Sequence, residues 1–233
     1  MYSALIAAVV ALLSFGGESF AQSPHTLQVV EDVTLEHAST NFNYLEYLIV
    51  GLHPGYPKKR SLLRFENVPS GCSVVYHATM YLYYQYSHKA SFYTDAQVPF
   101  ITRTIQAHRV LKSWKETQAT STKRYSGVNW GTQWLGLNNI DAKSVSTGHT
   151  TIHPTTKRGF VGIDVTSAVK DWKAGHPNYG VVIWATNENI AGRDTRFASK
   201  SESNSSKHPY IQVTCDGGSV GNTGYSGPDI GIH

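Results

Sequence analysis

The sequence lacks the short motifs that mark several common enzyme classes. It contains no HExxH or CxxC sequence, which removes the usual signals of a zinc protease and of a thiol redox centre. His149 and His153 are four residues apart, but their Thr-rich surroundings do not predict the helix on which this spacing would hold a metal ion. We therefore expect a noncatalytic protein. A polysaccharide lyase or hydrolase built from dispersed residues is the weaker alternative.

Cofactor signals are equally sparse. Asp141, Glu188 and Asp194 do not have the loop spacing that specifies a Ca²⁺ site, so no cofactor is expected, and a structural Ca²⁺ ion stays an open alternative. Only two cysteines are present. Cys72 follows a Pro-Ser-Gly turn, and Cys215 closes the last strand that the pattern predicts. In an oxidising compartment we expect one disulfide between them, with two separate buried thiols as the alternative.

Long hydrophobic runs are also scarce, and the sequence has one such run, at residues 4–15. Small residues follow it near Ala21, so residues 1–21 are predicted to form a secretory signal peptide. A run of about a dozen residues is shorter than the roughly 20 that a membrane-spanning helix needs. We therefore expect a secreted, extracellular protein without a membrane span.

Charge of either sign is sparse and scattered. The region after Ala21 keeps all 20 Lys and Arg residues and loses only Glu18 of the 16 acidic residues, which leaves a formal charge of +5. No run of five or more basic residues occurs. This pattern argues against nucleic acid as a partner and agrees with binding to an acidic polysaccharide.

Short alternating segments dominate what is present. They are rich in β-branched and aromatic residues, are separated by Gly, Pro, Asn and Ser, and predict about nine strands. We expect these strands at residues 27–35, 45–51, 60–65, 73–86, 104–112, 160–165, 181–185, 193–200 and 210–215. Such spacing predicts an all-β fold over residues 22–215, a jelly-roll-like antiparallel β-sandwich.

One short helix interrupts this pattern after residue 165. Thr166 is placed as its N-cap, and Val165, Ala168, Val169 and Trp172 recur at helical spacing. Gly175, followed by Pro177, should end the helix after about two turns. A helix this short must pack against a sheet, because isolated helices of such length are marginal in water.

Two segments show no periodicity. Residues 113–160 contain Trp114, Trp130 and Trp134 among Gly, Thr, Asn and Ser, and these tryptophans predict a long structured loop. Residues 216–233 form a Gly-rich tail that we expect to be disordered. Asn204 lies in the one glycosylation sequon that we find, in a predicted loop.

Six segments in order resemble one known family. They are RSLLRF at 60–65, PSGCSVVYHATMYLYY at 69–84, HRVLKSWKET at 108–117, IDVTSAVKDW at 163–172, NYGVVI at 178–183, and RFASKSE with PYIQVT at 196–214. The chain resembles the DNRLRE domain family, also described as carbohydrate-binding module family 96, over nearly all of its length after residue 26. The resemblance implies a secreted, usually noncatalytic β-sandwich that binds a polysaccharide such as alginate, or else occurs free-standing in extracellular matrix.

A sandwich that binds acidic sugars needs aromatic faces and cationic side chains on an outward surface. The candidates for carbohydrate contact are Arg60, Arg64, Tyr83, Arg109, Trp114, Arg196 and Lys200. Tyr81, Tyr83, Tyr84 and Tyr86 fall on both faces of one strand, so one pair is expected to lie outward. The alternatives are that these tyrosines fill the core, that Trp114 packs under the long loop, and that Arg109 forms an ion pair with Asp164 or Glu202.

The primary hypothesis is therefore a secreted, noncatalytic module that binds acidic polysaccharide. The alternative from another class is a structural protein of the extracellular or skeletal matrix, held by contacts with matrix proteins. A free-standing sandwich with a Gly-rich tail suits that alternative.

Overall fold

The computed structural model describes residues 22–217, and nearly all of its regular structure is β-strand. The strands are β1 Gln22–Leu35, β2 Tyr47–Leu52, β3 Lys58–Phe65, β4 Cys72–His88, β5 Arg103–Arg109, β6 Lys123–Tyr125, β7 Val128–Asn129, β8 Gly148–Ile152, β9 Gly159–Asp164, β10 Val181–Ala185, β11 Asp194–Ala198 and β12 Tyr210–Gly217. The helix α1 covers Thr166–Lys173, and the short 3-10 helix η1 covers Ser205–Lys207. The predicted all-β antiparallel sandwich, with one short helix and a long structured loop, is confirmed.

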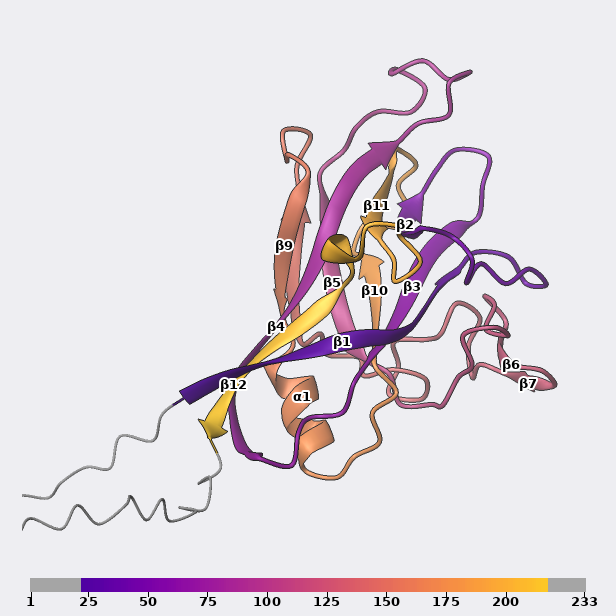
Figure 1. Ribbon diagram of the computed structural model, residues 1–233. Coiled ribbons are helices and arrows are strands. Elements are labelled where there is room, and N and C mark those ends of the chain that lie inside the picture. Colours follow the sequence, from indigo (N-terminus) through magenta and orange to yellow (C-terminus); the bar gives the residue numbers. More distant parts are fainter. Residues whose placement is uncertain (1–21, 218–233) are drawn as a thin grey trace, which may run out of the picture.

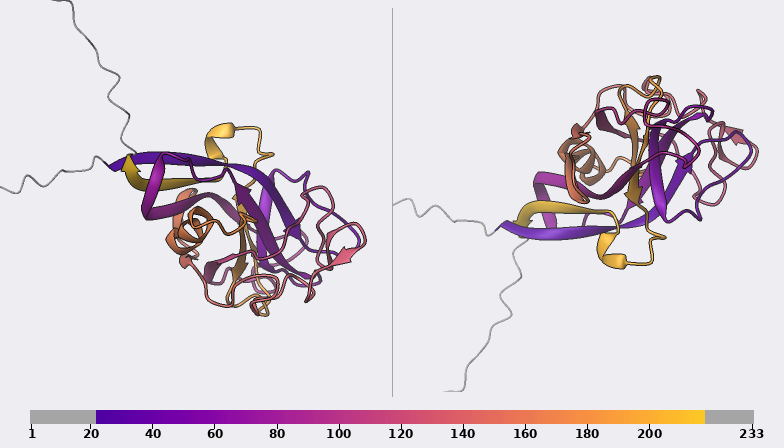
Figure 2. Two further views of the ribbon diagram at one scale, coloured as in Figure 1. Left: turned by 90° about the horizontal axis from the view of Figure 1, so that it is seen from below. Right: turned by 90° about the horizontal axis from the view of Figure 1, so that it is seen from above.

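The strands form a barrel-like sandwich in which every pairing between strands is antiparallel (Figure 1). The main sheet has the order β1-β12-β4-β11-β2-β3-β10-β5-β8, and β9 pairs with β4. The long strand β1 pairs with β12 in its first half and with β3 in its second half, after a register shift between Val29 and Glu31. Strand β1 therefore links two layers. The first layer contains β12, β4, β9, β11 and β2, and the second layer contains β3, β10, β5 and β8. Figure 2 shows the same arrangement from below and above.

The core lies between the two layers and is filled by alternate side chains. Leu82 and Tyr84 from β4, Phe197 from β11 and Ile183 from β10 are all buried there. Burial of each large apolar side chain stabilises a fold by about 1.5–3 kcal/mol. The same alternation turns the intervening residues of β4 toward solvent, and this places the candidate site described below.

Helix α1 closes one end of the barrel, at the bottom of Figure 1. Ala168, Val169 and Trp172 are buried in the main core, as the helical spacing predicted. The predicted N-cap was wrong, because Thr166 is the first helical residue and its hydroxyl oxygen instead accepts a hydrogen bond from the Ala78 N–H at 2.9 Å. The helix ends as expected, and Gly175 adopts a φ of +94°.

The long loop covers the outer side of the second layer. Trp114, Trp130 and Leu135 are buried in a second hydrophobic cluster that includes Leu62 of β3 and Val182 of β10. The sequence missed three short strands in this region: β6 and β7 pair with each other, and β8 joins the main sheet beside β5. Irregular spacing hides these strands, because each has only two to five residues.

The predicted disulfide between Cys72 and Cys215 is present, and both residues are buried. It joins the start of β4 to the last strand, next to the point where both ends of the described chain meet. Strand β12 runs on to Gly217, so the first two residues of the predicted tail belong to the sheet. The predicted signal peptide and the rest of the tail lie outside the described residues. In the described part, no helix is both long and apolar enough to cross a membrane.

Candidate functional site

The candidate site lies on the outer face of β4 and its neighbours. Tyr84 points into the core, whereas Tyr81 and Tyr83 lie on the opposite face and are partly exposed. A register shift in the pairing of β4 with β11 then sets Tyr86 opposite the outward-facing Arg196. The prediction that one pair of tyrosines lies outward is thus confirmed. The shift adds a third tyrosine to the same face.

Four rings form what we call the outer aromatic cluster: Tyr81, Tyr83, Phe160 and Tyr210. Tyr81 and Tyr210 are stacked, with ring centroids 5.0 Å apart. Phe160 is 40% exposed and stands edge-on to Tyr83 at 5.3 Å and to Tyr210 at 5.4 Å. Burial, with a contribution from Tyr81, raises the pKa of Tyr210, so its ring stays neutral at physiological pH. These rings come from β4, β9 and β12 and give the face a neutral aromatic platform.

Beside the cluster is a shallow polar hollow of about 160 Å³, which is lined by Tyr83, Gln85, Tyr86, Arg158 and Lys207. The Lys207 ammonium lies 5.6 Å from the centroid of the Tyr83 ring, and the Arg158 guanidinium carbon lies 5.8 Å from that of Tyr86. Both distances are within the range of cation–π contacts. Within residues 22–217, Arg158 forms no ion pair with a carboxylate.

One carboxylate stands behind this hollow. Glu202 accepts a hydrogen bond from Gln85 Nε2 at 2.6 Å, and its Oε1 is 3.4 Å from Lys207 Nζ. Partial burial works against its ionised form, but hydrogen bonds from the Asn204 N–H and from Lys207 leave the pKa of Glu202 below its usual range. Glu202 is therefore ionised and held in place. It positions Lys207 and Gln85 beside the tyrosines.

Further along the same face is a cavity of about 210 Å³, which we call the charged cavity. Its polar lining consists of Glu36, His53, Lys59, His88, Asp194 and Arg196. The rings of Phe42, Tyr47 and Tyr56, together with Leu45 and Ile49, complete the wall. The Tyr86 hydroxyl accepts a hydrogen bond from Arg196 NH1 at 3.1 Å, so the polar hollow and the charged cavity share a wall.

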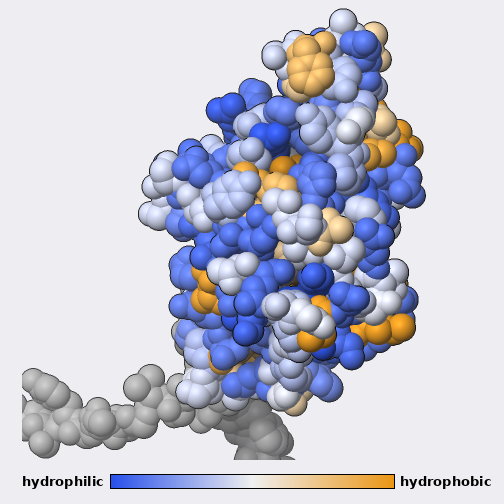
Figure 3. Space-filling model, turned by 90° about the vertical axis from the view of Figure 1, so that its right-hand side faces the viewer, coloured by the Kyte–Doolittle hydropathy of each residue, from blue (hydrophilic) through white to orange (hydrophobic). Residues whose placement is uncertain are grey.

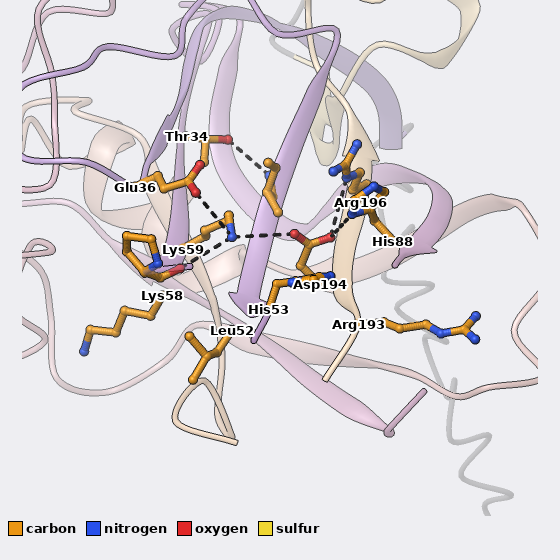
Figure 4. Close-up of polar contacts among 12 residues, drawn as sticks. Thr34, Glu36, Leu52, His53, Lys58, Lys59, His88, Arg193, Asp194 and Arg196 are labelled. Atoms are coloured by element: carbon orange, nitrogen blue, oxygen red, sulfur yellow. Dashed lines mark hydrogen bonds and ion pairs between the residues drawn. The ribbon is translucent and has the colours of Figure 1, made fainter. Parts of the chain in front are cut away.

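Charges of both signs alternate inside the cavity, as Figure 4 shows. Lys59 Nζ lies between Glu36 Oε1 at 3.4 Å and Asp194 Oδ2 at 3.6 Å. The other oxygen of Asp194 faces Arg196 Nε at 3.5 Å and His88 Nδ1 at 3.7 Å. Burial, reinforced by the Arg196 charge, lowers the pKa of His88, so this ring is neutral at pH 7.

The seven predicted contact residues lie in different places. Tyr83 lines the polar hollow and Arg196 lines the charged cavity. Lys200 is paired with Glu116 at 3.1 Å, and Arg64 is paired with Glu31 at 2.6 Å. Both remain partly exposed but lie apart from these two sites. Their role in sugar binding stays a prediction.

The other three predicted contact residues serve as structural supports. Arg60 is buried and forms a two-bond fork with Glu188, from Nε at 2.9 Å and from NH2 at 2.7 Å. Arg109 is buried too, and its ion pair at 2.9 Å is with Asp171 of α1, not with Asp164 or Glu202 as expected. Trp114 packs under the long loop, the alternative given above, and its indole N–H donates to the carbonyl of Tyr179 at 2.8 Å.

The predicted contact residues did not include those that complete the site, namely Arg158, Phe160, Lys207 and Tyr210 on the outer face and Lys59 and Asp194 in the cavity. What was missing was strand order, since β9, η1 and β12 flank β4 only in the folded chain.

The sequence model of carbohydrate-binding module family 96 matches residues 23–215, which is almost all of the described chain. The chain therefore belongs to this family of carbohydrate-binding modules, and the resemblance noted from its motifs is confirmed. A search of curated proteins found no significant match.

No group of three His, Cys, Asp or Glu side chains in residues 22–217 is placed to hold a metal ion, and the open question of a structural Ca²⁺ ion stays untested.

Proposed function

We propose that this protein is a secreted, noncatalytic module that binds acidic polysaccharide along its outer face. The observation that carries the proposal is the convergence of Arg158 and Lys207 on Tyr83 and Tyr86, next to the outer aromatic cluster. The disulfide and the leader-like residues 1–21 support secretion.

This arrangement suits a chain of uronate sugars. Each such sugar has an apolar C–H face and a carboxylate. Aromatic rings contact the apolar face, and Arg binds a carboxylate through two parallel hydrogen bonds. Among residues 22–217 no carboxylate pairs with Arg158, so a ligand carboxylate meets little competition from them. The cluster and the hollow lie side by side on one face, as a polymer with several sugar contacts requires.

Features of the polar hollow also support a binding role without catalysis. Its one neighbouring carboxylate, Glu202, is held by Gln85 and Lys207, and no histidine lines it. Histidine is the most frequent general acid–base group in enzymes, and the lining of the hollow contains none. The hollow offers cations, hydroxyls and an amide, which hold a sugar in place.

The test is affinity electrophoresis of the chain from Gln22 onward in gels that contain alginate, pectin, chondroitin sulfate, chitosan or a neutral glucan. We expect retardation by at least one acidic polymer, and the retardation should weaken as salt rises. A variant carrying Arg158→Gln and Lys207→Gln should bind that polymer about tenfold or more weakly, since hydrogen bonds to charged groups contribute about 1.5–3 kcal/mol each.

The matched control carries Lys112→Gln and Lys123→Gln, which remove the same charge at exposed positions away from the hollow. Equal loss in both variants would show that only net charge matters and would refute the proposed site. Absence of retardation in every acidic gel would refute the proposed ligand class. Binding that needs a protein component of matrix instead would support the alternative of a matrix protein.

A further inference from the structure

We propose that the charged cavity binds a single neutral sugar residue through two neighbouring hydroxyl groups. This ligand differs from the acidic chain proposed for the polar hollow, and the proposal does not depend on that one. Three features support it: the size of the cavity, the balance of its charges, and buried polar atoms that have no hydrogen-bond partner among residues 22–217.

The cavity is small and is partly open to solvent. Its volume of about 210 Å³ is below the range of about 300–1,000 Å³ that is typical of sites for drug-sized ligands. A cavity of this volume accommodates about one sugar ring, and the rest of a longer chain would extend out through the open side. The ligand therefore enters as a chain end, a side branch or a free sugar.

The charges in the cavity cancel. Lys59 and Arg196 face the two carboxylates of Glu36 and Asp194, and the pKa of His88 is lowered by burial, so that ring is neutral. His53 makes its own contacts with the protein backbone, from Nδ1 to the carbonyl of Pro54 at 2.9 Å and from the Ala90 N–H to Nε2 at 3.4 Å. An acidic ligand would meet the carboxylates, and a cationic ligand would meet the two bases. A neutral ligand avoids both costs.

Three buried polar atoms around the cavity make no hydrogen bond within the described chain: Asp194 Oδ1, Arg196 Nε and His88 Nδ1. Asp194 has the greatest need of a hydrogen-bond partner, because its side chain is only 3% exposed. Its oxygens lie 3.5–3.7 Å from the neighbouring nitrogens, which is too long for good hydrogen bonds. Leaving such groups unsatisfied costs about 1–3 kcal/mol each. The wall is thus prepared for a ligand that both donates and accepts.

A pair of adjacent hydroxyl groups meets this demand. Once the Asp194 and Arg196 side chains turn slightly toward the cavity, one hydroxyl donates to the Asp194 carboxylate and accepts from Arg196, and the next accepts from Lys59 and donates to Glu36. The rings of Tyr47 and Tyr56 at the wall supply apolar faces for the C–H groups of the sugar. The same combination excludes a simple apolar ligand, which would bury these charges without partners.

The test is an NMR titration of the ¹⁵N-labelled chain from Gln22 onward with the methyl glycosides of mannose, galactose, glucose and fucose. The diol-free control is tetrahydropyran-2-methanol, a ring of the same size. We expect at least one glycoside to shift the amide signals of Ile49, Lys59 and Arg196, and the control to leave them unchanged. If no glycoside at millimolar concentration shifts these signals, or if the control does so equally, the proposal is overturned.

Two variants locate the ligand. Asp194→Asn keeps the size of the side chain and removes its charge, and it should weaken binding about tenfold or more. Tyr56→Ala removes a ring that is 46% exposed at the rim, so it should weaken binding without affecting the fold. Its matched control is Tyr44→Ala, because Tyr44 is 65% exposed and does not line the cavity.

These variants also separate the two proposals. If Asp194→Asn fails to fold, the comparison of Tyr56→Ala with Tyr44→Ala still decides, and equal affinity in the two would contradict the cavity as the binding site. Arg158→Gln should leave the neutral glycoside bound and weaken only the acidic polymer. Failure of the polymer experiment therefore does not remove the cavity proposal, and failure of the glycoside titration does not remove the polymer proposal.

Discussion

The disulfide between Cys72 and Cys215 should contribute a large share of the stability of this domain. It closes a loop with a sequence separation of 143 residues, which is most of the described chain. In the chain-entropy model, closing a loop of this length lowers the entropy of the unfolded chain by about 17 cal/mol/K, or about 5 kcal/mol at 25 °C. Domains of this kind have a total free energy of unfolding of about 5–15 kcal/mol. Without the disulfide, the free energy of unfolding of this domain should therefore be small.

The perturbation is the double variant Cys72→Ala and Cys215→Ala. Alanine is preferable to serine, because both positions are fully buried and a hydroxyl there would need a hydrogen-bond partner. We expect the free energy of unfolding in urea at pH 7 to fall by about 3–5 kcal/mol, while the antiparallel pairing of β1, β4 and β12 keeps the folded structure intact.

The control is the unmutated protein with and without a reducing agent. Reduction should lower its stability by a similar amount, and the same agent should not change the double variant. A loss below about 1 kcal/mol in the double variant would refute the reasoning, because the unfolded chain would then not gain the freedom that the loop length predicts.

Three further predictions concern buried groups. Burial raises the pKa of Asp32 to about 7, so the folded protein holds this proton more tightly than the unfolded chain does. The free energy of unfolding should therefore fall by up to about 1.4 kcal/mol per pH unit as pH rises from about 4 to 7. Urea titrations of Asp32→Asn should lack this slope. Glu188→Gln breaks the buried fork with Arg60 and should cost about 3–5 kcal/mol by the same assay, so a neutral result would contradict the structural role of that pair. Gly180→Ala should lower the thermal midpoint, since its Cβ would meet the carbonyl of Leu63 at a φ of +77°, and an unchanged midpoint would contradict this.

The fold followed from the sequence wherever local patterns carried the information. All nine expected strands are present, because each is a short run rich in β-branched and aromatic residues between turn-forming residues. The three missed strands lie in the long loop, where β8 gains its place from pairing with β5 and not from its own pattern. The prediction that Thr166 is the N-cap of α1 was wrong for a similar reason. A distant backbone N–H, that of Ala78, engages the hydroxyl of Thr166.

The candidate site was harder to predict, because it depends on which strands are neighbours. The phase of the tyrosines in β4 indicated that one pair lies outward, and Arg196 was named as a candidate contact before its strand was known to pair with β4. Arg158 and Lys207 gave no local signal, since each belongs to an irregular or short segment that only the fold brings to β4. The reasoning that an arginine on an apolar face needs a partner was sound for Arg109, although the partner proved to be Asp171.

Two kinds of arginine thus shared one sequence pattern. Arg60 and Arg109 are buried and paired with protein carboxylates, whereas Arg158 lies outward with an aromatic ring beside it. A position in the sequence does not distinguish them, because this pairing depends on residues more than 60 positions away. The face shown in Figure 3 is mostly hydrophilic, with separate small hydrophobic patches, so surface hydropathy alone does not identify a ligand there.

The most direct test of the central claim is a calorimetric titration of the chain from Gln22 onward with a uronate oligosaccharide and with the same oligosaccharide after chemical reduction of its carboxylates. The predicted result is binding to the uronate form that weakens as salt rises. This binding should be largely lost when the carboxylates are reduced, and also in the variant carrying Arg158→Gln and Lys207→Gln. Equal binding of the reduced and unreduced forms, or binding that does not depend on these two side chains, would contradict the account.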